Sequence, residues 1–116
     1  MTQIGQAAEP LYSALSRDPA LAEIVEMFVE EMPDRIAALQ NQLDACQWEG
    51  LARTAHQLKG AAGSYGYAPV SRSAAQLEAA VRDGEPEAQI RDAVDTLIAV
   101  CKRARGGAPP IGSGRI

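Results

Sequence analysis

The sequence has few aromatic residues and a single histidine. Phe, Trp and Tyr make up 4% of its 116 residues, whereas 22 residues are alanine. Aromatic residues favour strands and alanine favours helices, so this composition argues against a strand-rich sandwich and for one helical domain. Because His56 is the only histidine, a zinc site built from several histidines is excluded. Any histidine chemistry must occur at His56.

The sequence also lacks an excess of basic residues. It has 11 Lys and Arg against 15 Asp and Glu, which gives a formal net charge of −4 and a pI of about 4.9. The charge is uneven, because residues 1–50 hold nine acids and two bases whereas residues 51–83 hold four bases and two acids. Nucleic acid is therefore not expected as a partner. His56 lies in a locally basic part of an acidic protein.

Long apolar runs are missing, and cysteine is scarce. No stretch approaches the roughly 20 apolar residues of a membrane span. No basic residue precedes Arg17 and no continuous apolar block follows the first residue, so we expect no signal peptide, no membrane partner and a cytoplasmic location. Cys46 and Cys101 fall at apolar positions of expected helices, which favours a reduced, buried pair over a disulfide.

Apolar residues recur every three or four positions in five segments, as expected for amphipathic helices. Proline marks helix starts, because it is tolerated in the first turn, and glycine marks helix ends. No segment has the alternation of a strand. The starts lie near Pro19, Pro33, Pro69 and Pro86, the stops at Gly66, Gly84 and Gly106–Gly107, and the apolar sets span 21–32, 36–46, 51–65, 70–81 and 90–101.

Short connections between helices make successive helices antiparallel neighbours. We therefore predict an all-α fold, an antiparallel up-down four-helix bundle, with an additional N-terminal helix packed across one end. The domain organisation expected is a lead segment (1–18), the bundle domain (19–105) and a flexible tail rich in Gly and Pro (106–116).

The third expected helix carries an unusual row of small residues beside its histidine. Its core face is formed by residues 51, 55, 58, 62 and 65, and His56 lies one position, or about 100°, away from that face. His56 shares a stripe with Ala52, Gly60 and Gly63, although each mid-helix glycine costs about 1 kcal/mol relative to alanine. Either another helix approaches closely here, or the surface is cleared so that another protein can reach His56. Lys59 lies one turn away and can place a cation beside an anion on the imidazole.

Residues 56–66, HQLKGAAGSYG, closely resemble the signature of histidine-containing phosphotransfer (HPt) domains of two-component phosphorelays. That signature is His, any residue, Leu, Lys, Gly, two small residues and Gly, and the wider resemblance covers about 21–103. The resemblance implies the family's helical bundle. It also implies that His56 accepts a phosphoryl group through Nε2, that Lys59 neutralises the phosphoryl oxygens, and that Gly60 leaves room for the partner.

Glu78 follows His56 by 22 residues, the spacing at which HPt domains commonly place a Gln or Glu facing the histidine. A carboxylate that accepts Nδ1–H would fix the tautomer and leave the Nε2 lone pair free. The alternative is an ordinary solvated Glu paired with Arg82 at i+4. Many members of the family have Gln here.

The resemblance implies a phosphohistidine carrier without ATP-dependent kinase activity, rather than an enzyme. Its partners would be receiver domains of response regulators or a hybrid sensor histidine kinase. We expect the protein itself to be a monomer. The Mg²⁺ would be carried by the receiver, and no metal or cofactor is expected here. The docking surface would include flanking apolar residues of the second helix and the residues around the histidine, namely Ala52, Arg53, Gln57, Gly60 and Gly63.

Two other functions stay open from the residues alone. The bundle could be an adaptor that binds receiver domains without carrying phosphate, although the intact His56, Lys59 and Gly60 argue against this. An enzyme could use His56 as a general acid or base, but no second histidine and only Glu78 are expected nearby. A cleft beside His56 would favour the enzyme, and a convex exposed stripe would exclude it.

Overall fold

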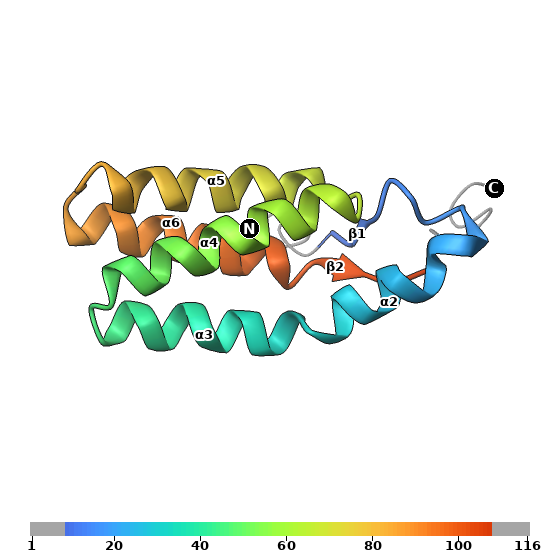
Figure 1. Cartoon of the computed structure of the whole chain (residues 1–116), viewed down its shortest axis with the longest axis horizontal. Coiled ribbons are helices and arrows are strands. Elements are labelled where there is room, and N and C mark those ends of the chain that lie inside the picture. The colour runs from blue at the N-terminus through green and yellow to red at the C-terminus, as the bar shows by residue number, and fades with distance from the viewer. Residues whose placement is uncertain (1–8, 108–116) are drawn as a thin grey trace.

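Four antiparallel helices form the bundle in the computed structural model, which describes residues 9–107 (Figure 1). Each helix packs against the next, and the last packs back against the first, so α4 and α6 lie diagonally opposite each other. The predicted all-α bundle is confirmed. Its helices are α3 (Met32–Asp44), α4 (Trp48–Ser64), α5 (Ala68–Arg82) and α6 (Glu87–Cys101).

The predicted start and stop residues account for most helix boundaries. Pro33 and Pro69 lie in the first turns of α3 and α5, where their missing N–H costs nothing. Asp18 accepts a hydrogen bond from the backbone N–H of Ala20 and caps the short 3-10 helix η1 (Pro19–Leu21). Gly66 and Gly84 follow α4 and α5 with φ of +85° and +70°, a backbone conformation that favours glycine.

The core is built from leucine and small residues of all four bundle helices. Five leucines are fully buried, and burying each stabilises the fold by about 1.5–3 kcal/mol. Ala55, Ala62 and Ala74 are also fully buried on α4 and α5, and their short side chains let these two helices approach closely. The buried leucines are Leu39, Leu51, Leu58, Leu77 and Leu97.

The helix that precedes the bundle is α2 (Ala22–Glu30), which runs on from α3 past the end of the other helices (Figure 1). Its Val25 and Phe28 are buried. The ring of Phe28 lies 5.3 Å, centroid to centroid, from the rings of both Tyr65 and Tyr67. Through Phe28, α2 covers the core at the end where α4 turns into α5.

A short strand pair corrects the prediction that the chain has no strands. β1 (Leu11–Tyr12) pairs in parallel with β2 (Ala104–Arg105), and the buried Tyr67 donates a hydrogen bond to the carbonyl of Arg105. The last helix therefore ends at Cys101, earlier than the predicted stop at Gly106–Gly107. A pairing of two residues is too short to show alternation. Residues 1–8 and 108–116, which include most of the predicted flexible tail, lie outside the described residues.

Both cysteines are free, but only one is buried as predicted. Cys101 lies in the core, and burial raises the pKa of its thiol to about 12. Cys46 is exposed, which corrects the prediction of a buried pair. It lies after the end of α3 with φ of 55°, so it belongs to the turn rather than to the apolar face of a helix.

Within residues 9–107, no helix combines the length and the apolar composition that crossing a membrane requires.

Candidate functional site

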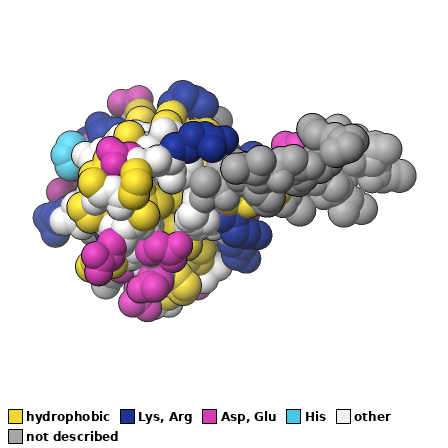
Figure 2. Space-filling model, turned by 90° about the vertical axis from the view of Figure 1, so that its right-hand side faces the viewer, with side chains coloured by type: hydrophobic (Ala, Val, Ile, Leu, Met, Phe, Trp, Pro, Cys, Tyr) yellow, Lys and Arg dark blue, Asp and Glu magenta, His cyan; other side chains and the backbone are white. Residues whose placement is uncertain are grey.

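His56 lies near the middle of α4 on the side that faces solvent. Its side chain is 60% exposed, whereas its neighbours Ala55 and Leu58 are fully buried. This is the position predicted from the helical periodicity, one residue away from the core face. Figure 2 shows the single histidine projecting at the edge of the molecule.

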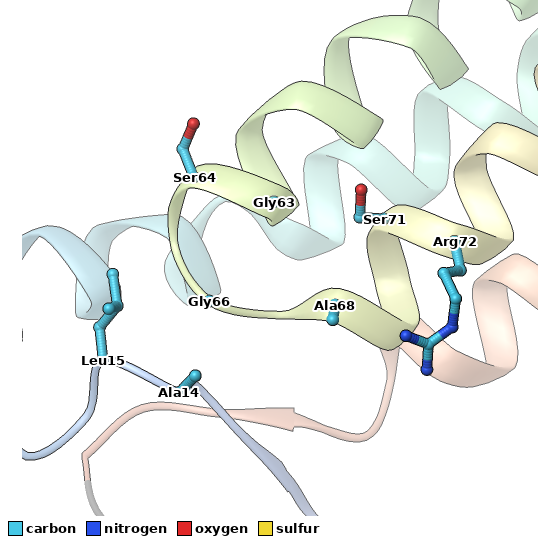
Figure 3. A pocket seen from close by; sticks show the side chains of 8 residues that line it. All are labelled: Ala14, Leu15, Gly63, Ser64, Gly66, Ala68, Ser71 and Arg72. Carbon is cyan, nitrogen blue, oxygen red and sulfur yellow. The ribbon is translucent and has the colours of Figure 1, made fainter.

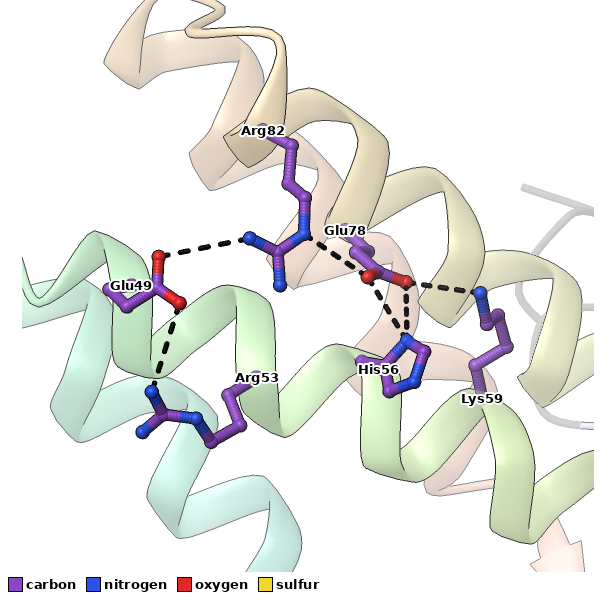
Figure 4. A network of polar contacts seen from close by, with 6 residues as sticks. All are labelled: Glu49, Arg53, His56, Lys59, Glu78 and Arg82. Carbon is purple, nitrogen blue, oxygen red and sulfur yellow. Dashed lines mark hydrogen bonds and ion pairs between the residues drawn. The ribbon is translucent and has the colours of Figure 1, made fainter.

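Glu78 of α5 holds one nitrogen of the imidazole ring. Nδ1 of His56 lies 3.2 Å and 3.1 Å from Oε1 and Oε2 of Glu78 (Figure 4). A carboxylate only accepts hydrogen bonds, so Nδ1 carries the proton and donates it. The neutral ring then keeps its lone pair on Nε2, which points away from Glu78. This arrangement leaves a nucleophilic nitrogen facing solvent.

Two cations share the same carboxylate. Nζ of Lys59 lies 3.1 Å from Oε1 of Glu78, and Nε of Arg82 lies 3.2 Å from Oε2. The side chain of Glu78 is only 15% exposed. Burial acts to raise the pKa of Glu78, but the hydrogen bonds from Lys59, His56 and Arg82 outweigh it and lower the pKa to about 2. Glu78 is therefore ionised at neutral pH.

Arg82 links the site to a second acidic residue. Its Nη1 lies 3.7 Å from Oε1 of Glu49 on α4, and Nη2 of Arg53 lies 3.7 Å from Oε2 of the same residue (Figure 4). The sequence offered Arg82 only as the ordinary i+4 partner of Glu78. The spacing alone could not show that Arg82 joins the carboxylate that holds His56, nor that it bridges two helices.

The two glycines near His56 have different surroundings. A Cβ on Gly60 would meet nothing within 4 Å, so this position is open surface. A Cβ on Gly63 would lie 3.4 Å from Oγ of Ser71 on α5, and Ser71 Oγ also donates a hydrogen bond of 2.9 Å to the carbonyl of Lys59. Gly60 thus clears the surface beside His56, while Gly63 lies where α5 comes close.

The remaining predicted docking residues divide into exposed and buried. Ala52 is fully buried, which corrects its assignment to the exposed stripe. α4 packs against both α3 and α5, so its buried face is wider than a single line of apolar residues, and Ala52 falls inside it. Arg53 and Gln57 are exposed, as expected for residues that contact a partner.

The exposed apolar residues near the site come from α2, not from the second predicted helix. Among residues 9–107 the large exposed hydrophobic side chains are Ile24 and Met27, which are 41% and 53% exposed. Both lie off the buried Val25–Phe28 face. Figure 2 shows an apolar patch with acidic side chains below it on this end of the molecule. A cavity of about 300 Å³ there is lined by Ile24, Met27, Phe28, Glu31, Arg35, Ala61 and Tyr65.

The surface cavities described for residues 9–107 lie away from the histidine. A cavity of about 400 Å³ lies where the segment before η1 meets the α4–α5 turn, and it is lined by Gly63, Ser71 and Arg72 among others (Figure 3). His56, Lys59 and Glu78 line none of five surface cavities found in the described part of the chain. No cluster of three or more metal-ligating side chains occurs within residues 9–107. The open setting of His56 does not favour an enzyme with an enclosed substrate site.

The site is thus one exposed imidazole on a helical bundle, backed by a carboxylate and flanked by a lysine. In the comparison with protein families, the family model of the Hpt domain matches residues 23–105. The chain therefore belongs to the Hpt domain family, whose members are phosphohistidine carriers of two-component signalling and not kinases. Searches of the curated proteins and of the solved structures gave no match.

Proposed function

We propose that this protein is a phosphorelay intermediate that carries a phosphoryl group on Nε2 of His56. The group would come from a receiver-domain aspartate or a sensor kinase and pass to the receiver domain of another response regulator. The observation that carries the proposal is the hydrogen bond between Nδ1 of His56 and Glu78, at 3.1 Å, on an exposed helix face. In the neutral ring this contact places the proton on Nδ1, so the lone pair of Nε2 is open to a partner.

The transfer step needs little chemistry from this chain. The Nε2 lone pair attacks the phosphorus of the partner's aspartyl phosphate, an N–P bond forms, and the P–O bond to the aspartate breaks. The bonding electrons leave with the aspartate as its carboxylate. The ring then bears a positive charge, and Glu78 stabilises it because its carboxylate still accepts Nδ1–H. Transfer to the next receiver is the same step in reverse.

Lys59 and Gly60 would serve the phosphoryl group and its donor. Phosphoryl transfer depends mainly on positioning and on neutralising the charge of the phosphoryl oxygens. Lys59 supplies a cation one turn from His56, and its side chain is 38% exposed. The open space above Gly60 lets the partner's aspartate and its Mg²⁺ approach in line with Nε2. The metal belongs to the partner in this scheme.

The docking surface would extend from the histidine across to α2. Gln57 lines a cavity together with Glu31 and Arg35, and these two residues also line the cavity beside Ile24 and Met27. The two hollows are therefore neighbours on the surface. A receiver domain that offers an apolar helix face would bury Ile24 and Met27 while its aspartate reaches His56. We further propose that the protein acts in the cytoplasm as a monomer.

Label transfer from a charged receiver tests the proposal. A receiver domain is phosphorylated with a small radiolabelled phosphodonor and Mg²⁺, purified from the donor and mixed with the full chain. We expect acid-labile, alkali-stable label on the wild type and none on His56→Gln. Equal labelling of both would refute the assignment of His56. Stable receiver binding by the wild type without labelling would indicate the adaptor instead.

A further inference from the structure

One carboxylate in the site has more partners than it has oxygens. Glu78 contacts Lys59 through Oε1, Arg82 through Oε2, and His56 through both. The proposed function, on which this inference rests, gives Lys59 a second task at the phosphoryl group on Nε2. Nε2 and Nδ1 are on different edges of the ring, and the ammonium group of Lys59 is at present bound on the Nδ1 side.

We propose that Lys59 exchanges partners when His56 is phosphorylated: its ammonium group moves from Glu78 to the phosphoryl oxygens. Arg82 is then the positioning residue that keeps the carboxylate of Glu78 on Nδ1 of His56. Lysine suits the moving role, because its ammonium is a point charge on a flexible four-carbon stem. Arginine suits the fixed role, because its planar guanidinium offers donors in a rigid fork.

Arg82 is held from two sides in a way that Lys59 is not. It is bound by Glu78 one turn before it on α5 and also lies 3.7 Å from Glu49 on α4. Arg53 contacts the other oxygen of Glu49 and adds a further cation to this row. Figure 4 shows Glu49 and Arg53 on the side of His56 away from Lys59, so Arg82 can stay in place while a partner approaches over the open Gly60.

The charges favour the exchange. A phosphoryl group on Nε2 brings about two negative charges, so it attracts the nearest mobile cation more strongly than the single charge of Glu78 does. If Arg82 were absent, Glu78 would keep Lys59 as its remaining cation. The phosphoryl group would then lose its counter-charge, or Glu78 would keep only the Nδ1–H of His56 when Lys59 moved.

Nuclear magnetic resonance of the lysine ammonium groups can observe the exchange directly. The chain has two lysines, Lys59 and Lys102, so the spectrum of the full chain labelled with ¹⁵N-lysine contains one reporter and one internal control. Phosphoramidate serves as the chemical phosphodonor, since His56 is the only histidine. On phosphorylation we expect the Lys59 resonance to shift while that of Lys102 stays in place. An unmoved Lys59 resonance would overturn the exchange.

Kinetics test the role of Arg82, with a closely matched control. Arg91 forms the same i,i+4 ion pair, at 3.0 Å from Glu87, and it also lies 4.0 Å from Asp44 on α3. The side chain of Arg91 is 47% exposed and that of Arg82 is 48% exposed. We expect Arg82→Gln to slow phosphoryl transfer from a receiver about two- to fivefold, as loss of an exposed ion pair does. Arg82→Lys should restore part of the rate, and Arg91→Gln should not change it.

Each result bears on one claim. Equal transfer rates for Arg82→Gln and the wild type would refute the positioning role, and so would an equal loss of rate in Arg91→Gln. If a charged receiver failed to label the wild type, the proposed relay function would be wrong. The Lys59 resonance, read with phosphoramidate alone, would still decide the partner exchange in that case.

Discussion

Nζ of Lys59 lies 3.1 Å from Oε1 of Glu78, the same distance that separates Oε2 from Nδ1 of His56. One carboxylate on α5 therefore fixes both the nucleophile and the cation of α4. His56 and Lys59 are one turn apart on their own helix, so the two contacts also fix how α4 faces α5. The site is an arrangement of two helices, although its signature lies in one.

The charge of Glu78 can be separated from its hydrogen bond by two substitutions. Glu78→Gln keeps an oxygen that accepts Nδ1–H, so we expect phosphoryl transfer to stay within a few-fold of the wild type. Glu78→Ala removes the acceptor and frees both tautomers of His56. Hydrogen bonds to charged groups contribute about 1.5–3 kcal/mol, so transfer should fall at least about tenfold.

The measurement is the initial rate of label transfer from a phosphorylated receiver, with circular dichroism to verify that both variants fold. Ring ¹⁵N shifts of His56 report the tautomer in the same samples. If Glu78→Ala transferred as fast as Glu78→Gln, the orienting role of Glu78 would be wrong.

Glu78 should also contribute to the pH dependence of stability. The pKa of the Glu78 carboxyl is lowered from 4.5 to about 2 in the folded protein. At a pH between these two values, Glu78 therefore binds a proton more tightly in the unfolded chain than in the folded one. The contribution is complete above the unfolded pKa and is lost as the pH falls through about 2. From pH 6 to pH 3 we expect the unfolding midpoint of the wild type to fall further than that of Glu78→Gln.

Urea unfolding at a series of pH values measures this difference, and Glu87→Gln serves as the control. Glu87 forms an exposed ion pair with Arg91 and lacks the three partners of Glu78. Parallel pH profiles for the wild type and Glu78→Gln would contradict the expectation.

Helical periodicity was sufficient to predict the bundle. Buried residues such as Leu58, Leu77 and Leu97 occupy the predicted faces, and proline and glycine mark most of the predicted ends. The β1–β2 pair escaped prediction because two residues carry no periodic signal. Cys46 was wrongly predicted to be buried, because the helix ends before it at a turn that no glycine marks in the sequence; Cys46 itself has the positive φ there.

The site was partly predictable for a similar reason. A fixed spacing on one helix places Lys59 beside His56, and the family's spacing placed Glu78 opposite. Periodicity describes one helix at a time, so it could not show that two neighbouring helices cover Ala52. Nor could it show that Arg82 reaches both Glu78 and Glu49.

Gly60 offers a test in which stability and transfer change in opposite directions. Its Cβ position is open, so Gly60→Ala should stabilise the helix by up to about 1 kcal/mol. A bulky Gly60→Leu would also fit the fold but would occupy the space through which a partner reaches Nε2. We expect it to slow transfer by about tenfold or more, because small displacements of reacting atoms are costly.

Ala99→Leu is the control for Gly60→Leu, since Ala99 is exposed on α6, diagonally opposite α4. Urea unfolding and receiver-dependent labelling are measured on all variants. Unchanged transfer in Gly60→Leu would show that a partner does not approach over Gly60.

The exposed apolar residues of α2 should determine receiver binding rather than chemistry. Ile24 and Met27 are 41% and 53% exposed and line a hollow that neighbours the one lined by Gln57. Truncating a central interface residue costs more than about 1 kcal/mol, so Met27→Ala and Ile24→Ala should each weaken binding at least about fivefold. Isothermal titration with a receiver domain measures the affinity.

Phosphorylation by phosphoramidate needs no docking and should be unchanged in both variants. An unchanged affinity would place the docking surface elsewhere, whereas a loss of phosphoramidate labelling would mean that α2 supports His56 itself.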